Sequence, residues 1–246
     1  MDRVTLTDKD AAGITINGKP LITYKPDVTK HGTHDQSSHN PHKGGRGSLA
    51  GGTRYEPEEI RDVYAEAEFE LSEGENTAVR DYVAQGHTLN GAIRQGKTDF
   101  PSARAPMEET TARLDSAIAS APPMEDMAVW RVADVRSVAG LKVGDVVRDR
   151  GYASTTVADL TKPENGMMLL SLNSVSSGQK TLLEINTGED GKGLFIPAFG
   201  VGATVEFEKE FLLPRESLME YLGARQMPLS GGKSMQIHQF KVVSGE

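Results

Sequence analysis

The chain has 246 residues, of which 37% are hydrophobic and 25% are charged, so it is long enough for one domain of ordinary core size with additional segments. Its formal net charge of -8 argues against a general nucleic-acid binder, because neutralising phosphates requires a basic surface. The sequence contains no cysteine, which excludes disulfides, thiol catalysis and thiolate metal sites. It also lacks the apolar stretch of a signal peptide or the ~20 apolar residues of a membrane span, so we expect a soluble protein.

The first 53 residues form two segments of different composition. Residues 1–24 contain ITINGKPLITY, in which Asn17 and Gly18 between two β-rich runs predict a small hairpin. Residues 25–53 are rich in Gly, Ser and His, and they hold too little apolar surface to offset the entropy of ordering. We therefore expect a short β-leaning segment followed by a disordered linker.

That linker contains four of the six histidines: His31, His34, His39 and His42. Closely spaced imidazoles can bind zinc, but disordered ligands bind metals weakly, so a flexible polar tail is the favoured interpretation. The segment HGTHDQSSH is similar to His-Asp-Gln-containing segments of tailed-phage head proteins, a resemblance that suggests a phage origin.

From Tyr55 onward the pattern becomes helical. Pro57 stands at a favoured first helical position, and the acidic residues after it suit the positive end of the helix dipole. An apolar stripe then follows at helical spacing, made of Ile60, Val63, Tyr64, Ala67 and Leu71. This pattern predicts a first amphipathic helix.

Three more helices are predicted before any strong strand. Residues 75–86 and 87–96 read as two short helices, because Gly86 can end the first and Thr88 can cap the second. Residues 107–123 form the last, with apolar residues four apart.

From Met127 the period changes to short β-leaning runs separated by Gly, Pro, Asn and Asp. The runs are residues 127–134, 150–157, 167–173, 181–186, 193–199, 208–214 and 237–243. Helices first and strands later predict an α+β domain instead of an alternating parallel fold. The chain has no glycine-rich phosphate loop at a strand-helix junction, so neither a Walker nor a Rossmann nucleotide site is supported.

One run, VEFEKEFLL at residues 205–213, carries three acidic residues at alternate positions. In a strand, alternate side chains share a face, so we expect Glu206, Glu208 and Glu210 to point the same way. The structural interpretation is a solvated edge strand whose charges protect it from aggregation. The functional interpretation is a carboxylate row that faces a cation.

Three motifs in this order, VWRV, GYASTT and EKEFLLP, resemble the arginine-serine-glutamate class of mono-ADP-ribosyltransferases, the clostridial-toxin-like exoenzyme family. The resemblance covers roughly Tyr55 to Val243 and includes the helical segment with Asn90. The serine motif of the family usually reads Ser-Thr-Ser, and Thr156 in the last place is a departure that keeps a hydroxyl.

The resemblance implies an N-terminal helical lobe followed by a mixed β-sandwich-like core with an NAD cleft, all within residues 54–246. The implied reaction transfers ADP-ribose from NAD to a protein acceptor, with nicotinamide release and no metal requirement. The resemblance assigns Arg131 to the NAD pyrophosphate and Tyr152 to the nicotinamide, and it has Ser154 position Glu210 and the ribose. Thr155 and Asn90 are also assigned to the NAD site.

The chemistry of NAD fits two carboxylates. Nicotinamide leaves as a neutral molecule without a general acid, so catalysis needs stabilisation of an oxocarbenium-like ribose, for which Glu210 is the candidate. Residues i and i+2 of a strand have Cα atoms roughly 6.5 to 7 Å apart, which leaves room for a guanidinium between the side chains. Glu208 is therefore the candidate general base, and family analogy implies arginine as the acceptor.

Other interpretations stay open at the level of sequence. Arg131 can satisfy a buried acid, Ser154 can be a routine strand-end hydroxyl, and Tyr152 can be core. Water in place of the acceptor would make the protein an NAD glycohydrolase, and a degenerate domain would leave a virion structural or interaction protein. Residues 198–207 are the expected acceptor-contacting loop, with Phe199 or Phe207 as an exposed contact. We expect a virion or host-cytoplasmic location if the chain is phage-encoded, or secretion without a signal peptide.

Overall fold

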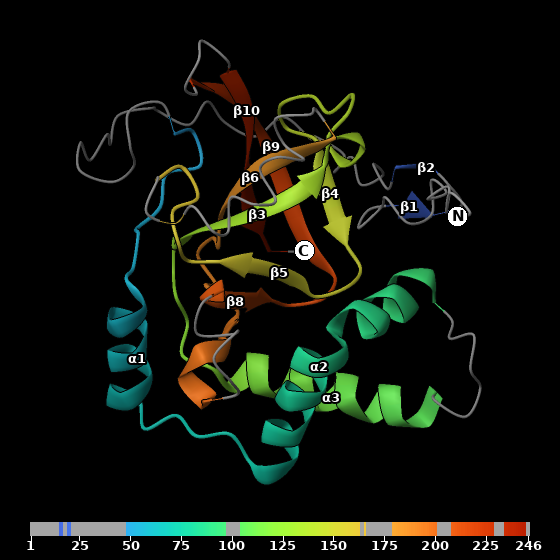
Figure 1. The fold of residues 1–246 in the computed structure, drawn as a ribbon, viewed down its shortest axis with the longest axis vertical. Coiled ribbons are helices and arrows are strands. Elements are labelled where there is room, and N and C mark those ends of the chain that lie inside the picture. Colours follow the sequence, from blue (N-terminus) through green and yellow to red (C-terminus); the bar gives the residue numbers. More distant parts are fainter. Residues whose placement is uncertain are drawn as a thin grey trace, which may run out of the picture.

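The computed structural model describes residues 15–16, 19–20, 48–96, 104–162, 165, 179–200, 208–228 and 234–244. Within these residues three α-helices precede a mixed sheet, as Figure 1 shows. The predicted α+β class, with helices first and strands later, is confirmed.

The first two helices each begin at a residue that caps the helix N-terminus. Helix α1 (Pro57–Glu66) starts with Pro57 and a capping box formed by Glu56 and Glu59. Helix α2 (Glu73–Gln95) starts at Ser72, whose hydroxyl accepts from the backbone N–H of Glu75, and it ends at Gly96 in the left-handed conformation. Helix α3 (Arg104–Ser120) follows.

Helix α2 combines the two helices predicted for residues 75–86 and 87–96. Its backbone leaves helical geometry at Gln85 (φ -139°, ψ 17°), so a kink stands one residue before Gly86, where the sequence predicted a break. The two predicted helical segments are thus both present, and they meet end to end at the kink without a loop between them.

Eight strands of the described residues form one sheet in the order β4-β9-β10-β6-β3-β5-β8-β7. They are β3 (Ala128–Asp134), β4 (Val146–Asp149), β5 (Ala153–Thr156), β6 (Lys180–Asn186), β7 (Leu194–Phe195), β8 (Glu210–Leu213), β9 (Ser217–Pro228) and β10 (Ser234–Val243). Strands β6 and β10 pair in parallel, and the other neighbours pair antiparallel.

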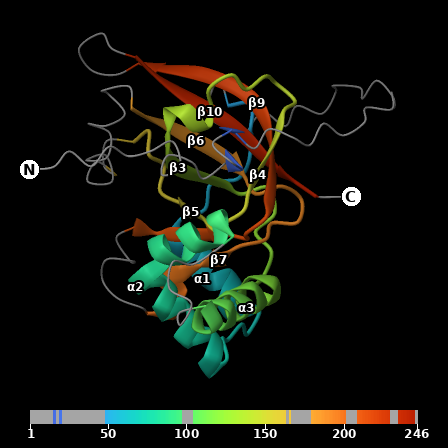
Figure 2. The ribbon, with the colours of Figure 1, turned by 90° about the vertical axis from the view of Figure 1, so that its right-hand side faces the viewer.

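The sheet nearly divides between β3 and β5. Only Trp130 and Thr156 are paired across this junction, whereas β3 pairs with β6 along its whole length. Strands β5, β8 and β7 therefore form a separate wing, and Figures 1 and 2 both place this wing between the larger part of the sheet and helices α2 and α3.

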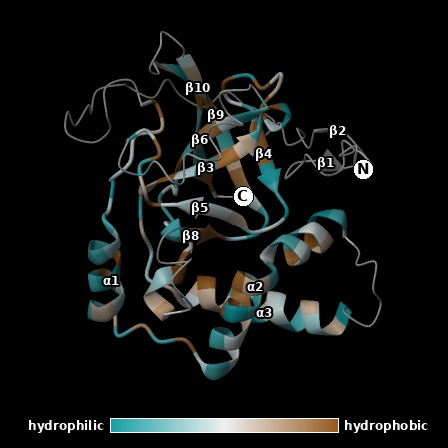
Figure 3. Cartoon of the chain, in the orientation of Figure 1, coloured by the Kyte–Doolittle hydropathy of each residue, from teal (hydrophilic) through white to brown (hydrophobic). Residues whose placement is uncertain are grey.

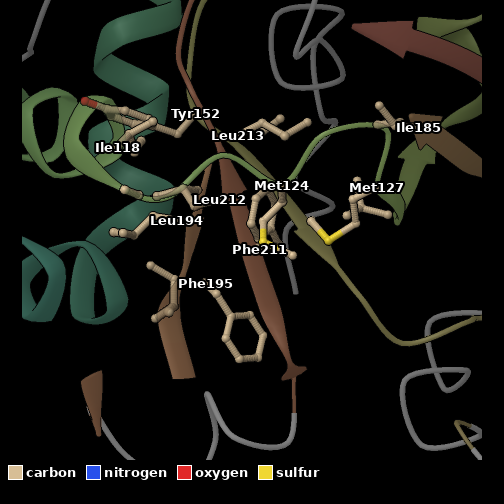
Figure 4. Packing of buried hydrophobic residues seen from close by; sticks show 14 of the residues in the cluster. Ile118, Met124, Met127, Tyr152, Ile185, Leu194, Phe195, Phe211, Leu212 and Leu213 are labelled. Carbon is tan, nitrogen blue, oxygen red and sulfur yellow. The ribbon is translucent and has the colours of Figure 1, made fainter. Parts of the chain in front are cut away.

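The main core lies between the helices and the sheet. Leu114 and Ile118 of α3 belong to the same buried cluster as Phe195 and Phe211 of the β5-β8-β7 wing. Figure 4 shows part of this packing, and Figure 3 shows hydrophobic residues concentrated in the strands, whereas the helices carry both kinds of residue. Trp130 is fully buried in a second cluster on the sheet.

Residues 48–53 pack against the sheet, although the sequence suggested a linker up to residue 53. The carbonyl of Ala50 accepts from Asn186 Nδ2 at 2.9 Å, and Thr53 exchanges backbone hydrogen bonds with Asp126 and Ala128. The folded domain therefore includes Ser48 to Thr53. Residues 25–47, with the four histidines, lie outside the described residues, and their role as a linker stays a prediction.

Near the N-terminus, β1 (Thr15–Ile16) and β2 (Lys19–Pro20) pair antiparallel, in the segment where the sequence predicted a hairpin. Strands β4 and β9 were not predicted. Residues 193–199 form only the two-residue strand β7 and then a 3-10 helix (Ile196–Phe199), because Pro197 has no N–H for a sheet. The predicted strand at 167–173 lies outside the described residues.

None of the described helices meets the length and hydropathy needed to cross a membrane.

Candidate active site

The residues expected to do the chemistry gather around one cavity of about 520 Å³ at the junction of β3 and the β5-β8-β7 wing. This volume lies in the range of small-molecule sites. Residues from α2, β3, the start of β5 and the turn before β8 line it: Tyr82, Val83, Gly86, His87, Asn90, Arg94, Arg131, Tyr152, Ser154, Glu208 and Glu210.

Arg131 reaches the cavity from β3 and makes an ion pair there. Its Nη1 lies 2.9 Å from Oδ2 of Asp149, whose side chain is 1% exposed. Arg94 of α2 binds the same carboxylate, with Nε 3.0 Å from Oδ1 and Nη2 3.1 Å from Oδ2. Two guanidiniums share one carboxylate, so one net positive charge remains at this end of the cavity.

Asn90 and Tyr152 connect α2 to the segment before β5. The backbone N–H of Tyr152 donates to Asn90 Oδ1 at 2.8 Å, and the backbone carbonyl of Tyr152 accepts from Arg94 Nη2 at 3.2 Å. The Tyr152 hydroxyl lies 2.8 Å from Asp115 Oδ1 and 2.9 Å from the carbonyl of Thr111, both on α3. The side chain is fully buried, so Tyr152 is a fixed part of the cavity wall as well as a core residue.

The successive residues Ser154 and Thr155 of β5 direct their hydroxyls to opposite faces of the sheet. Ser154 is exposed at the cavity, whereas the Thr155 hydroxyl donates to the backbone carbonyl of Phe211. The structure therefore does not bring Thr155, expected at the NAD site, into the cavity, because successive strand residues face opposite ways. Thr156 is the last residue of β5, and its Oγ1 accepts from the backbone N–H of Ala158 at 3.1 Å in the turn that follows.

The acidic run differs from the predicted strand. Strand β8 begins only at Glu210, and Lys209 before it has φ +48°, a left-handed conformation that interrupts the extended backbone. Glu208 and Glu210 therefore do not share one face of a strand, as the sequence predicted, yet both side chains line the same cavity. Glu206 lies outside the described residues.

Glu210 is a buried carboxylate held by hydroxyl groups. Its side chain is 7% exposed, Tyr82 Oη donates to its Oε1 at 3.0 Å, and the Ser154 hydroxyl also binds it. Burial raises the pKa of Glu210 and the negative charge of Glu208 adds to this rise, while the two hydroxyls lower it. Glu208 itself is exposed. The two carboxylates thus occupy different environments.

Sequence reasoning missed the lining residues Tyr82 and Arg94, and it missed Asp149, which binds both arginines of the cavity. Tyr82 and Arg94 lie on the same side of α2 as Asn90, at helical spacings of eight and four residues from it, so a face analysis of the helix would indicate them. Asp149 lies at the end of β4, a strand that the sequence pattern did not show.

A larger recess of about 900 Å³ lies between α1 and residues 198–199. It contains none of the residues with an expected chemical role, so size alone does not mark the site. Phe199, proposed as an exposed acceptor contact, is instead partly buried, with its ring 6.2 Å from that of Tyr64 and 6.1 Å from that of Phe69. Residues 201–207 lie outside the described residues.

Among the described residues, His, Asp and Glu form no group of three or more able to hold a metal ion.

The family model of the ADP-ribosyltransferase exoenzymes matches residues 61–241. Solved structures similar to this chain include Plx2a, an ADP-ribosyltransferase toxin from Paenibacillus larvae, with 16% identity, 78% of this chain and 98% of that chain covered, and a TM-score of 0.59. The C3 exoenzyme of Clostridium limosum has 17% identity, 78% and 97% coverage and a TM-score of 0.55. The Vis toxin of Vibrio splendidus has 18% identity, 76% and 83% coverage and a TM-score of 0.56. At these identities the structures establish the fold. Among curated proteins, none matches this sequence significantly.

Proposed function

Because the chain belongs to the ADP-ribosyltransferase exoenzyme family, for which NAD is the substrate, we propose that it transfers ADP-ribose from NAD to an arginine side chain of a protein acceptor. Nicotinamide is the second product. The observation that carries the proposal is the meeting of Arg131, Ser154, Glu208 and Glu210 in one cavity.

The charges in the cavity suit NAD. Arg94 and Arg131 present guanidiniums at one end, where their planar N–H groups can donate to pyrophosphate oxygens. Asp149 fixes both guanidiniums and cancels only one of their two positive charges. The nicotinamide ribose would then lie toward Ser154 and Glu210, beside the wall formed by Tyr152 and Asn90.

Glu210 has the properties required for cleavage of the glycosidic bond. When the bond between the ribose C1′ and the nicotinamide nitrogen breaks, both its electrons leave with nicotinamide, which departs neutral. Positive charge then develops on the ribose. The ionised Glu210 carboxylate, fixed by Tyr82 and Ser154, stabilises that charge without reorganising.

Glu208 is placed to activate the acceptor. A guanidinium nitrogen of the acceptor forms the new bond to C1′ and loses a proton, which the Glu208 carboxylate accepts. Glu208 is exposed at the mouth of the cavity and close enough to Glu210 to raise the pKa of that group. Attack from the side opposite to nicotinamide inverts the configuration at C1′.

Two points support arginine as the acceptor. The acidic pair has glutamate in its first position, which by family analogy accompanies arginine modification. A structure of the similar Vis toxin was solved in complex with agmatine, a small guanidine. In the present chain, Glu208 supplies a carboxylate for the same cationic group.

The test is incubation of the protein with NAD and agmatine, with nicotinamide release measured by chromatography and ADP-ribosyl-agmatine by mass spectrometry. We expect both products, and neither from Glu210→Gln. Nicotinamide without the agmatine adduct would indicate an NAD glycohydrolase, and the absence of both would refute the proposal. Labelled NAD added to cell lysate, followed by mass spectrometry, would identify the modified protein.

A further inference from the structure

The carboxylate of Glu210 is buried without a cation beside it. The ion pairs of the described residues do not include Glu210. Its fixed partners are two neutral donors, Tyr82 from α2 and Ser154 from β5. Ser154 also lies at the cavity surface, where a substrate hydroxyl can compete for it. Tyr82 is 5% exposed, whereas Ser154 is exposed, so the hydrogen bond from Tyr82 is the more protected of the two.

The kink of α2 determines where Tyr82 lies. A Cβ atom at Gly86 would stand 2.9 Å from Tyr82 Cε2, so the ring lies directly against the glycine backbone. The ring also makes an edge contact with Tyr152, with centroids 6.2 Å apart and planes at 75°. Since Tyr152 is itself fixed to Asp115, both contacts restrain the Tyr82 ring.

We propose that Tyr82 is a positioning residue for the reaction: its hydroxyl fixes Oε1 of Glu210 and favours the ionised carboxylate that the developing ribose cation requires. Gly86 is part of this device because it leaves room for the ring. The inference rests on the proposed function, in which Glu210 stabilises the ribose cation.

The hydrogen bond between Tyr82 and Glu210 has a direct effect on protonation. Burial and the negative charge of Glu210 raise the pKa of Tyr82 well above its ordinary range, so its hydroxyl remains a donor at any working pH. The hydroxyls of Tyr82 and Ser154 oppose the rise in the pKa of Glu210 that burial causes. The other titratable or charged groups around the cavity are His87 and Arg94 of α2, Arg131 of β3 and the exposed Glu208. None of these is altered by removal of the Tyr82 hydroxyl.

The test is the pH profile of nicotinamide release by Tyr82→Phe, which keeps the ring and removes only the donor. Because hydrogen bonds to charged groups are the strong ones, we expect the acid limb of kcat/KM to move upward by roughly one pH unit or more. The KM for NAD should stay within about threefold of the wild-type value, since Tyr82→Phe keeps the ring that lines the cavity and removes only a hydroxyl that is bonded to Glu210. Gly86→Ala should move the limb in the same direction by displacing the ring.

Tyr64→Phe is the matched control. Tyr64 is equally buried, and its hydroxyl accepts from the backbone N–H of Phe195 at 3.0 Å, away from the cavity. This variant should lose stability without moving the acid limb. An unchanged limb in a folded Tyr82→Phe protein, or an equal shift in Tyr64→Phe, overturns the inference.

A second readout does not need activity. In protein labelled with ¹³C-glutamate, the carboxyl signal of Glu210, assigned by its loss in Glu210→Gln, can be titrated directly. Its midpoint should rise in Tyr82→Phe and not in Tyr64→Phe, and an unchanged midpoint in Tyr82→Phe overturns the inference. If the wild-type protein releases no nicotinamide at any pH, the proposed function fails, and this titration still decides whether Tyr82 controls Glu210.

Discussion

Arg131 donates from Nη1 to the carboxylate of Asp149 at 2.9 Å, and the same guanidinium lines the cavity that contains the two glutamates. The sequence offered two interpretations of this arginine, as the partner of a buried acid or as a phosphate ligand. The structure shows that Arg131 is the partner of a buried acid. The same guanidinium can also bind a phosphate, because it has five N–H donors and Asp149 does not use all of them.

We expect Arg131→Lys to weaken NAD binding although the charge is kept. A lysine ammonium is a point donor and cannot satisfy Asp149 and a pyrophosphate with the same planar fork. Hydrogen bonds to charged groups are worth about 1.5–3 kcal/mol, so the Kd for NAD should rise about tenfold or more in titration calorimetry. Arg148→Lys is the control, since Arg148 lies on the edge strand β4 and pairs with Glu216 at the surface. Equal NAD affinity in folded Arg131→Lys would leave Arg131 with a structural role alone.

The two glutamates should be separable by their effects on two products. Glu210→Gln should depress nicotinamide release and agmatine modification together, by roughly a hundredfold or more, because both need the charge on ribose to be stabilised. Glu208→Gln should abolish most agmatine modification and leave much of the slow NAD hydrolysis, since water can still trap the ribose cation. Glu206→Gln should change neither. Equal proportional losses in Glu208→Gln and Glu210→Gln would contradict this division, and circular dichroism would confirm folding.

Glu210→Gln should also stabilise the fold at neutral pH. Burial raises the pKa of Glu210, so the folded protein binds its proton more tightly than the unfolded chain does. The free energy of unfolding therefore falls as the pH rises from the ordinary pKa of glutamate through the raised pKa of Glu210 in the folded protein. At neutral pH the buried charge destabilises the fold. Glutamine removes that charge and still accepts from Tyr82.

Thermal melts at several pH values check this sign. The Tm of Glu210→Gln should exceed that of the wild type at pH 7.5, and the difference should shrink toward pH 4, where the wild-type carboxyl is protonated in both states. Glu208→Gln, which removes an exposed carboxylate, should show little change across the same range. A lower Tm for Glu210→Gln at pH 7.5 would mean that its ionised form stabilises the fold.

Two N-terminal deletions should differ in stability. Removal of residues 1–47 should leave NAD cleavage within about threefold of the full chain, a change below ~1 kcal/mol in the barrier. Removal of residues 1–53 should lower the Tm, because it leaves Asn186 Nδ2 and the backbone of Ala128 without their partners. A large loss of activity in the shorter deletion would instead assign a role to the deleted residues, which include the four histidines.

The sequence predicted those parts of the fold that carry a strong local signal. Pro57 and the stripe after it predicted α1, and the β-branched and aromatic residues of 128–134 predicted β3. The order of arginine, serine and glutamate motifs indicated which residues share a cavity, since the resemblance supplied the long-range information that periodicity lacks.

Other features depend on tertiary contacts that no local pattern contains. Strand β9 is rich in Leu, Met, Glu and Ala, which favour helices, and it is extended because it pairs along its length with β10. The register of Glu208 was misjudged because a lysine with positive φ is rare, and nothing in EKEF signals it. The Tyr82–Glu210 contact joins residues 128 positions apart, which single-sequence reasoning does not reach.

That separation has a consequence for biosynthesis. Translation proceeds at about 5–20 residues per second, so on the order of ten seconds pass between the synthesis of Tyr82 and that of Glu210. A chain that ends before Glu210 therefore contains the residues of α2 and β3 that line the cavity, but it lacks the carboxylate to which the proposed function assigns stabilisation of the ribose cation.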